Sequence, residues 1–258
     1  MLVDMCYQKS PYPIVWFVSS NGYLLGMTYV PEQQVVAWHW HDTAGTFESV
    51  TTVAEGNDDP IYVVVNRTLN GNTVRCIERQ ASRLFASRAD SYLVDCGLTY
   101  DGVAATVISG LDHLEGETVS ILADGAVCTD QVVNSGTITL DVAASKVHVG
   151  LAYISDIETL PAAFEGPAYG QGAVKNVNRV WLRVVDSAGV FVGPSTDDLT
   201  EYKQRTTEVY GEPPGLITGE IDIDITPTWQ DGGQVFVRQT APLPLTITAL
   251  VCEVEVGN

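Results

Sequence analysis

Two histidines near the start of the chain have the spacing of metal ligands. His39 and His41 stand two positions apart in the segment 38–41 (WHWH), so in a β-strand both side chains lie on one face. With Asp42 or Glu48 as a further ligand they could bind a transition metal. The flanking tryptophans favour the other interpretation, in which the imidazoles pack among aromatic rings, and we predict no metal site.

A row of carboxylates near the C-terminus could serve glycoside hydrolysis, which uses a pair of Asp or Glu side chains. Glu220, Asp222 and Asp224 alternate with isoleucines in the segment 220–225. Alternation places the acids on one face of a strand and the isoleucines on the other, with no sign of a cleft. The pattern favours a sheet with one packed face, and a tail-associated glycan hydrolase is kept as an alternative.

No other catalytic or cofactor motif emerges from the sequence. The GxSxG motif of hydrolases is absent, and Gly170-Gln171-Gly172 lacks the remainder of a phosphate-binding loop. The Asp-Gly pairs at 101–102, 124–125 and 231–232 lack the spacing of a calcium-binding EF-hand and are interpreted as hairpin turns. The sequence thus predicts a non-catalytic protein without a cofactor.

The cysteines and the remaining histidines are predicted to be structural. The cysteines are odd in number and form no CxxC pair, which disfavours both a disulfide framework and a zinc site. We expect free, mostly buried thiols, as in a chain assembled in a reducing cytoplasm. His113 and His148 have no evident partner in the sequence. The cysteines are Cys6, Cys76, Cys96, Cys128 and Cys252.

The composition is acidic. The chain of 258 residues carries 32 acidic and 13 basic residues, a formal net charge of −19. This charge excludes binding of nucleic acid through its phosphates, which needs clustered Lys and Arg, but suits a path along which DNA passes without sticking. Charged residues make up only 17%, below the usual ~25%, which indicates surface buried against other subunits. No apolar run approaches the ~20 residues of a membrane span and the first residues do not resemble a signal peptide, so no membrane insertion is expected.

Apolar residues alternate with period two in nearly every segment, which predicts an all-β chain. Asn-Gly pairs at 21–22 and 70–71 mark two hairpins, because both turn positions favour positive φ. Residues 13–18 (PIVWFV) and 60–65 (PIYVVV) echo each other at an offset of 47 residues, a spacing typical of β-propeller blades. The predicted strands of this region cover 14–20, 23–30, 35–41, 47–55, 61–67 and 73–80.

The predicted organisation has four parts. Two propeller-like blades, which need further blades because a propeller has at least four, are followed by a connector. A small β-barrel tip domain with many Gly-containing turns comes next, and then a β-sandwich-like platform. The platform contains a Pro/Gly/Ala-rich loop over 161–176 and a hairpin over 179–193 that turns at Ser187-Ala188-Gly189. The four parts are residues 1–80, 81–93, 94–150 and 151–258.

Long stretches of the chain resemble the C-terminal portion of the tail nozzle (tail-stabilisation) proteins of short-tailed bacteriophages. WHWHDTAGTFESVTTVAEG and VVNRTLNGNTVRCIER resemble their closing propeller blades. LTYDGVAATVISGLDHLEGETVSILADGAV resembles their small tip domain, and NRVWLRVVDSAGVFVGP and QVFVRQTAPLPLTITALVCEVEV resemble their platform strands. The resemblance follows one order through nearly the whole chain.

The resemblance implies a structural virion protein without enzymatic residues, which assembles in the host cytoplasm as a homo-oligomeric, hexameric ring. Such a ring lies below the portal and adaptor proteins and beside tail fibre or tailspike proteins. It extends and gates the channel through which genomic DNA leaves the particle, and DNA passes without specific binding. The alternative is a carbohydrate- or receptor-binding β-module of a tail fibre.

The acidic excess is densest in the predicted tip domain. Residues 91–150 carry eight acids and one base, a net charge of −7. Repeated around a ring, this density produces a negative potential in a narrow channel and keeps DNA sliding by repulsion. The alternative is that the acids only keep an exposed tip in solution. The predicted channel-lining residues are Asp112, Glu115, Glu117, Asp124 and Asp130.

Overall fold

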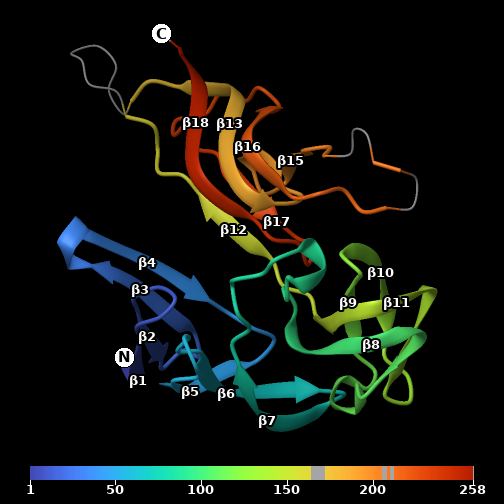
Figure 1. Cartoon of the computed structure of the whole chain (residues 1–258). Coiled ribbons are helices and arrows are strands. Elements are labelled where there is room, and N and C mark those ends of the chain that lie inside the picture. The colour runs from blue at the N-terminus through green and yellow to red at the C-terminus, as the bar shows by residue number, and fades with distance from the viewer. Residues whose placement is uncertain (164–171, 205–207, 210–211, 258) are drawn as a thin grey trace. The chain divides into compact units, whose positions relative to one another are not determined.

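The computed structural model describes residues 1–163, 172–204, 208–209 and 212–257 of the chain. These residues form 18 β-strands and three short 3₁₀-helices, with no α-helix among them (Figure 1), so the all-β prediction is confirmed. The fold divides into two compact units. Unit 1 comprises Met1–Phe85, Val94–Val119 and Asp130–Leu151, and unit 2 comprises Ala86–Leu93, Ser120–Thr129 and Ala152–Asn258.

The first sheet is an antiparallel meander in the order β1-β2-β3-β4 (Figure 1). The sequence predicts its last three strands but not the first, because Asp4 and Gln8 interrupt the apolar pattern there. Both polar side chains have partners in the fold: Asp4 Oδ2 accepts a hydrogen bond from the Val50 amide, and Gln8 Oε1 accepts one from Trp16 Nε1. The elements are β1 (Leu2–Gln8), β2 (Ile14–Ser19), β3 (Leu24–Val30), η1 (Pro31–Gln33) and β4 (Val35–His41).

The second sheet is a meander of three strands, β5 (Thr46–Thr52), β6 (Ile61–Leu69) and β7 (Asn72–Arg79). The predicted Asn70-Gly71 turn joins β6 to β7, and both residues have positive φ, of 46° and 72°, as a two-residue hairpin turn requires. In the Asn21-Gly22 pair only the glycine has positive φ. The chain there forms a longer loop, closed by a hydrogen bond of 2.9 Å from the Ser19 amide to the Tyr23 carbonyl.

The two meanders pack on each other through one hydrophobic core. Its buried residues come mainly from β2 and β6, the second strand of each meander. Apart from Pro13 and Pro60, the segments 13–18 and 60–65 lie in these two strands, so the sequence echo marks equivalent strands that face a common core. Two meanders do not close a propeller, and the blade interpretation stays a prediction. The core residues from these strands are Ile14, Trp16, Val18, Ile61, Val63 and Val65.

The third sheet has the strand order β10-β9-β11-β8. The predicted turns at Asp124-Gly125 and Ser135-Gly136 are present, with positive φ at all four residues. The turn predicted at Asp101-Gly102 is wrong: Asp101 lies inside β8 and pairs with Lys146 beside a register shift. A glycine in a strand interior marks such a bulge as readily as a turn. The elements are β8 (Asp95–Ser109), η3 (Asp112–Leu114), β9 (Thr118–Ala123), β10 (Ala126–Val132) and β11 (Thr137–Leu151).

No closed barrel is found among the described strands of this sheet, so the barrel form of the tip domain stays a prediction. The predicted connector over 81–93 contains no strand, and its one regular element is η2 (Arg88–Asp90). Much of the predicted loop over 161–176, including Gly170-Gln171, lies outside the described residues. The end of that loop belongs to a strand, because β13 begins at Lys175.

Two sheets share a hydrophobic core in unit 2, which is the packing of a β-sandwich. One sheet has the order β16-β13-β18 and the other the order β12-β17-β14-β15. In β16, Ile221 and Ile223 are buried whereas Glu220, Asp222 and Asp224 are exposed, as the alternation predicts. The strands are β12 (Ser155–Glu158), β13 (Lys175–Ser187), β14 (Phe191–Ser195), β15 (Asp198–Glu201), β16 (Ile217–Asp224), β17 (Phe236–Gln239) and β18 (Thr246–Val256).

The hairpin predicted over 179–193 is wrong, because β13 and β14 belong to different sheets. The segment between them is a corner at which the chain leaves one sheet for the other. Gln239 Nε2 donates to the carbonyls of Ala188 and Gly189, both at 2.8 Å, and the Ala188 amide donates to the Pro244 carbonyl. Two apolar strands joined by a glycine-containing turn give the same sequence pattern whether the strands pair as a hairpin or join different sheets at a corner, which is why the sequence predicted a hairpin here.

Candidate interaction surfaces

The four-stranded meander carries an apolar surface on the side opposite its core. Residues directly opposite each other in antiparallel strands point to the same side, so the register defines this surface as two rows across the sheet. We name the eight residues of these rows the outer face. One row is Met5, Phe17, Leu25 and Trp40, and the other is Tyr7, Val15, Met27 and Trp38.

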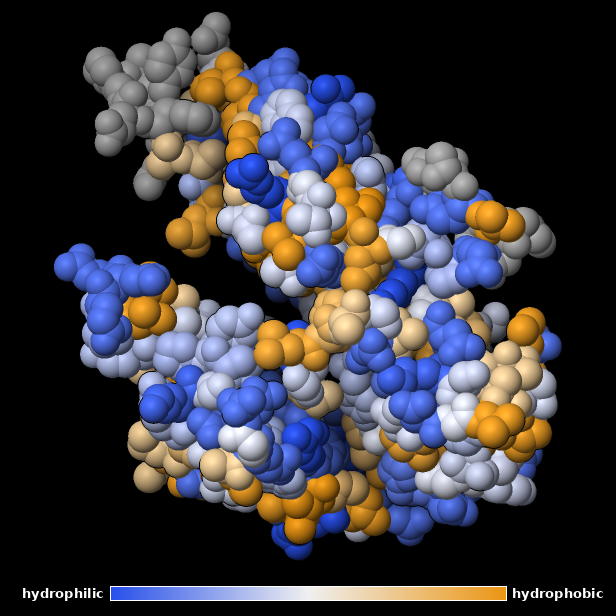
Figure 2. Space-filling model, in the orientation of Figure 1, coloured by the Kyte–Doolittle hydropathy of each residue, from blue (hydrophilic) through white to orange (hydrophobic). Residues whose placement is uncertain are grey.

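The outer face is open to solvent at both edges of the sheet. Trp38 and Trp40 in β4 are 60% and 63% exposed, and the two residues from β1 are also more than half exposed. Phe17 stacks on Trp38 with ring centroids 5.7 Å apart, and Tyr23 meets Trp40 edge-on at 5.4 Å. Figure 2 colours residues by hydropathy, and tryptophan and tyrosine have intermediate values on that scale. The aromatic residues of the outer face are therefore not orange there, and the face is defined by strand register and exposure instead.

A sequence signal for this surface exists in the continuous apolar run of β2. The run Ile14–Val18 has no polar residue, whereas a strand with one wet face alternates. Ile14, Trp16 and Val18 fill the core, and the residues between them belong to the outer face. The run therefore indicates that both faces of β2 are apolar.

The second meander differs, because its side away from the core carries ion pairs and is mostly polar, apart from residues such as the exposed Ile77. Arg75 pairs with Glu48 and Arg79 pairs with Glu55, each at 2.7 Å. The Tyr62 hydroxyl also donates to Glu55. The hydrogen bonds from the two arginines hold the pKa values of Glu48 and Glu55 below their usual range. This side has the character of a surface that faces water.

The candidate metal ligands His39 and His41 lie on the core side of β4. His39 Nδ1 is 2.8 Å from His41 Nε2, and both rings contact Trp16, with centroids 5.3 and 5.5 Å away. Glu48, one carboxylate considered as a ligand, is bound to Arg75. Among the described residues no third Cys, Asp, Glu or His donor joins the pair in a metal-binding cluster, and the geometry agrees with aromatic packing.

The remaining histidines have partners that the sequence does not reveal. His148 is buried, and its Nδ1 lies 2.8 Å from the Thr99 hydroxyl. His113 Nε2 lies 2.9 Å from the Cys96 carbonyl. All five cysteines are free, as predicted, but they are half-buried rather than buried. Burial and the charge of Glu78 raise the pKa of the Cys96 thiol.

The five predicted channel-lining acids are divided between the two units. Asp112, Glu115, Glu117 and Asp130 belong to unit 1, and Asp124 belongs to unit 2. The three aspartates are exposed, whereas the two glutamates are half-buried. Exposure alone therefore separates two groups within the predicted set.

Glu115 and Glu117 stabilise turns. The Glu115 carboxylate accepts hydrogen bonds from the amides of Gly136, at 2.8 Å, and Ser135, at 3.0 Å. These bonds hold the pKa of Glu115 below its usual range. Glu117 Oε1 accepts a hydrogen bond of 2.8 Å from the Asn70 amide in the β6–β7 turn. A structural role for both glutamates is thus visible in unit 1.

The carboxylates of β16 form an open row. Glu220, Asp222 and Asp224 are all exposed on a regular strand. Asp224 pairs with Arg179 at 2.6 Å. Such a row does not place two carboxylates on opposite sides of a substrate, which glycoside hydrolysis needs.

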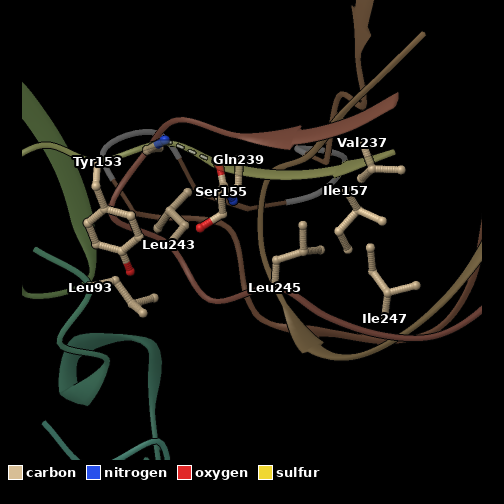
Figure 3. A pocket seen from close by; sticks show the side chains of 10 residues that line it. Leu93, Tyr153, Ser155, Ile157, Val237, Gln239, Leu243, Leu245 and Ile247 are labelled. Atoms are coloured by element: carbon tan, nitrogen blue, oxygen red, sulfur yellow. Dashed lines mark hydrogen bonds between the residues drawn. The ribbon is translucent and has the colours of Figure 1, made fainter. Parts of the chain in front are cut away.

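A pocket of about 180 Å³ lies in unit 2 (Figure 3). Its lining is mainly aliphatic, and its amide-bearing residue, Gln239, is already bonded. Gln239 Nε2 donates to two carbonyls, and its Oε1 accepts a hydrogen bond from the Ala241 amide (Figure 3). Ligand pockets are typically about 300–1,000 Å³ with polar groups free to orient the ligand, so this pocket is better explained as a gap in packing.

Comparison with known proteins leaves the family open. No family model matches the chain, and no curated protein matches its sequence. In the part of the chain that the structure describes, no helix combines the length and hydropathy needed to cross a membrane.

Proposed function

We propose that this chain is a structural virion protein, the C-terminal part of the tail nozzle of a short-tailed bacteriophage. In this proposal it forms a hexameric ring that extends and gates the DNA ejection channel, in contact with adaptor or portal proteins and with tail fibres or tailspikes. The observation that carries the proposal is the outer face. Large exposed apolar patches mark surfaces that are covered in an assembly.

The proposal assigns the outer face to contact with a further β-sheet of the assembled nozzle. Its two rows contain no charged residue, and apolar sheet faces pack by interdigitating their side chains. The two meanders already show this packing on the core side of the sheet. The ion-paired side of the second meander does not suit the same contact, because burying charges is costly.

Images of purified assemblies viewed down their axis test the proposal. The wild-type chain is expected to form rings with six-fold symmetry. The double variant Trp38→Lys/Trp40→Lys is expected to keep the wild-type circular dichroism spectrum but to form no rings. Ile77→Lys is the matched control, because Ile77 is 79% exposed on the polar side of the second meander. Trimers or monomers of the wild type contradict the nozzle, and rings of the double variant contradict the role of the outer face.

The exposed rings of Trp38 and Trp40 favour a second candidate, a carbohydrate-binding module of a tail fibre. Aromatic rings offer flat apolar surfaces with a polar edge, on which sugar rings can stack. A glycan array separates the two functions. Glycan binding that is lost in Trp38→Lys/Trp40→Lys and kept in Ile77→Lys supports the module, whereas a ring-forming wild type that binds no glycan supports the nozzle.

A further inference from the structure

Three potential metal ligands meet in unit 1, in a cluster that the proposed function does not use. Cys76 and Glu78 alternate on β7 and so project to one side of the strand, and Cys96 comes from β8. The two sulfur atoms and a carboxylate oxygen all lie within 4.8 Å of one another. We propose that these side chains bind a thiophilic divalent cation of the zinc class, which links β7 to β8.

The ligand set fits zinc. Zinc accepts cysteine sulfur at ~2.3 Å and carboxylate oxygen at ~2.0–2.2 Å in tetrahedral geometry, and hard cations such as magnesium and calcium select oxygen ligands instead. Three protein ligands leave the fourth position to water. All three residues are half-buried, so a cation can reach them from solvent. The thiols bind as thiolates and release their two protons, which balances the charge of the entering divalent cation.

The backbone at Cys96 provides independent support. Its φ of 49° lies in the left-handed region that favours glycine. Between the pairs Leu98–Val149 and Asp95–Leu151, β8 has one residue more than β11, which is a β-bulge at Cys96. Bulges redirect a side chain, and non-glycine residues in this region concentrate at functional sites. A cysteine at a position whose backbone favours glycine is explained if the Cys96 thiol serves as a metal ligand.

Arg67 orients the cluster from its buried side. Its guanidinium donates to both oxygens of Glu78, at 2.6 and 2.7 Å, and to Asp95 beside Cys96 at 2.9 Å. Hydrogen bonds that fix a ligating carboxylate are typical around metal sites. A carboxylate has about four lone-pair positions, so Glu78 can hold Arg67 and a cation together. The two carboxylates outweigh the single charge of Arg67, which leaves a net negative site.

Cobalt(II) is a suitable probe, because thiolate-bound cobalt shows a charge-transfer absorption band in the near ultraviolet. The full chain, kept reduced with a phosphine, is expected to bind one cobalt ion that zinc displaces. Zinc is also expected to raise the thermal unfolding midpoint, because a ligand of the folded state stabilises it. X-ray absorption of the zinc-loaded wild type should count two sulfur ligands, a measurement that needs no variant.

The variants Cys76→Ser and Cys96→Ser are each expected to lose the cobalt band with an unchanged circular dichroism spectrum. Their affinity should fall by about 100-fold or more, since even an outer partner of a ligand is worth about 10–100-fold. Cys252→Ser, in β18, is the matched control and should keep the band. A wild type without the band, a band that survives in both ligand variants, or zinc with fewer than two sulfur ligands overturns the proposal. These outcomes do not depend on whether rings form.

Discussion

Among single residues, Arg67 is a buried cation that pairs with two carboxylates, those of Glu78 and Asp95. Its side chain is fully buried, and besides its two carboxylate partners it donates to the Thr43 hydroxyl at 2.7 Å. Arg67→Met leaves Glu78 and Asp95 near each other without their cation. We expect the free energy of unfolding to fall by about 3 kcal/mol, because removing one partner of a buried ion pair strands the others. Urea denaturation measures this loss.

Arg75→Met is the control for this substitution. Arg75 also pairs with a glutamate, Glu48, but its side chain is 69% exposed. Exposed ion pairs contribute about 0–1 kcal/mol, so the expected loss is small. Equal losses in the two variants would show that burial does not set the strength of the Arg67 pairs.

His41 makes stability depend on pH in the acid range. Desolvation, with the charges of His39 and Arg83 nearby, lowers the pKa of His41 to about 4, against about 6.5 in an unfolded chain. Between pH ~6.5 and ~4 the His41 imidazole binds a proton in the unfolded chain but stays neutral in the folded chain. The free energy of unfolding therefore falls as the pH is lowered, until both states are protonated below about 4.

Urea unfolding of the wild type and of His41→Gln tests this pH dependence. The wild type should lose stability more steeply between pH ~6.5 and ~4. The difference is expected to be modest, because His41 is an exposed residue and solvent screens its interactions. Parallel curves for the two proteins would contradict the assignment to His41.

At the scale of elements, the attachment of β4 to its meander depends on Gly26. This residue pairs with His39 across β3 and β4, and a Cβ atom at Gly26 would overlap the imidazole ring. Gly26→Ala should lower the free energy of unfolding by about 1–3 kcal/mol through overpacking. Adding His39→Ala removes the obstacle, so the double variant should lose less than the sum of the single losses. Thermal unfolding of the three variants measures this coupling, and additive losses argue against it.

Strands are predictable where an apolar run and a turn signal coincide, as at β6, Asn70-Gly71 and β7. The polar residues of β1 conceal a strand, because Gln8 is satisfied by Trp16 from the neighbouring strand. The corner at Gly189 looks like a hairpin because local sequence does not encode which sheet a strand joins. Local sequence likewise gives no sign that Cys96 approaches Cys76, since the bulge that brings them together arises from pairing with β11.

For the whole molecule, the acids that suit a channel best are the exposed ones. The proposed nozzle function predicts that the variant Asp112→Lys/Asp130→Lys still forms rings, but that phage particles carrying it eject DNA more slowly, because repulsion from the proposed channel wall is lost. Added salt should restore the rate by screening. Glu220→Lys/Asp222→Lys, with the same charge change on exposed β16 residues, is the control. Normal ejection kinetics in the first variant would leave these acids a solubilising role.

In the proposed assembly the outer face of the first meander contacts a neighbour, whereas the surface of the second meander away from the core carries ion pairs. Open-ended growth by stacking sheet on sheet needs two contact surfaces on every copy. In the proposed assembly the pairs Glu48–Arg75 and Glu55–Arg79 oppose continued stacking through the second meander, because burying charges is costly. Charged side chains of this kind are one way in which β-proteins avoid growing into fibrils.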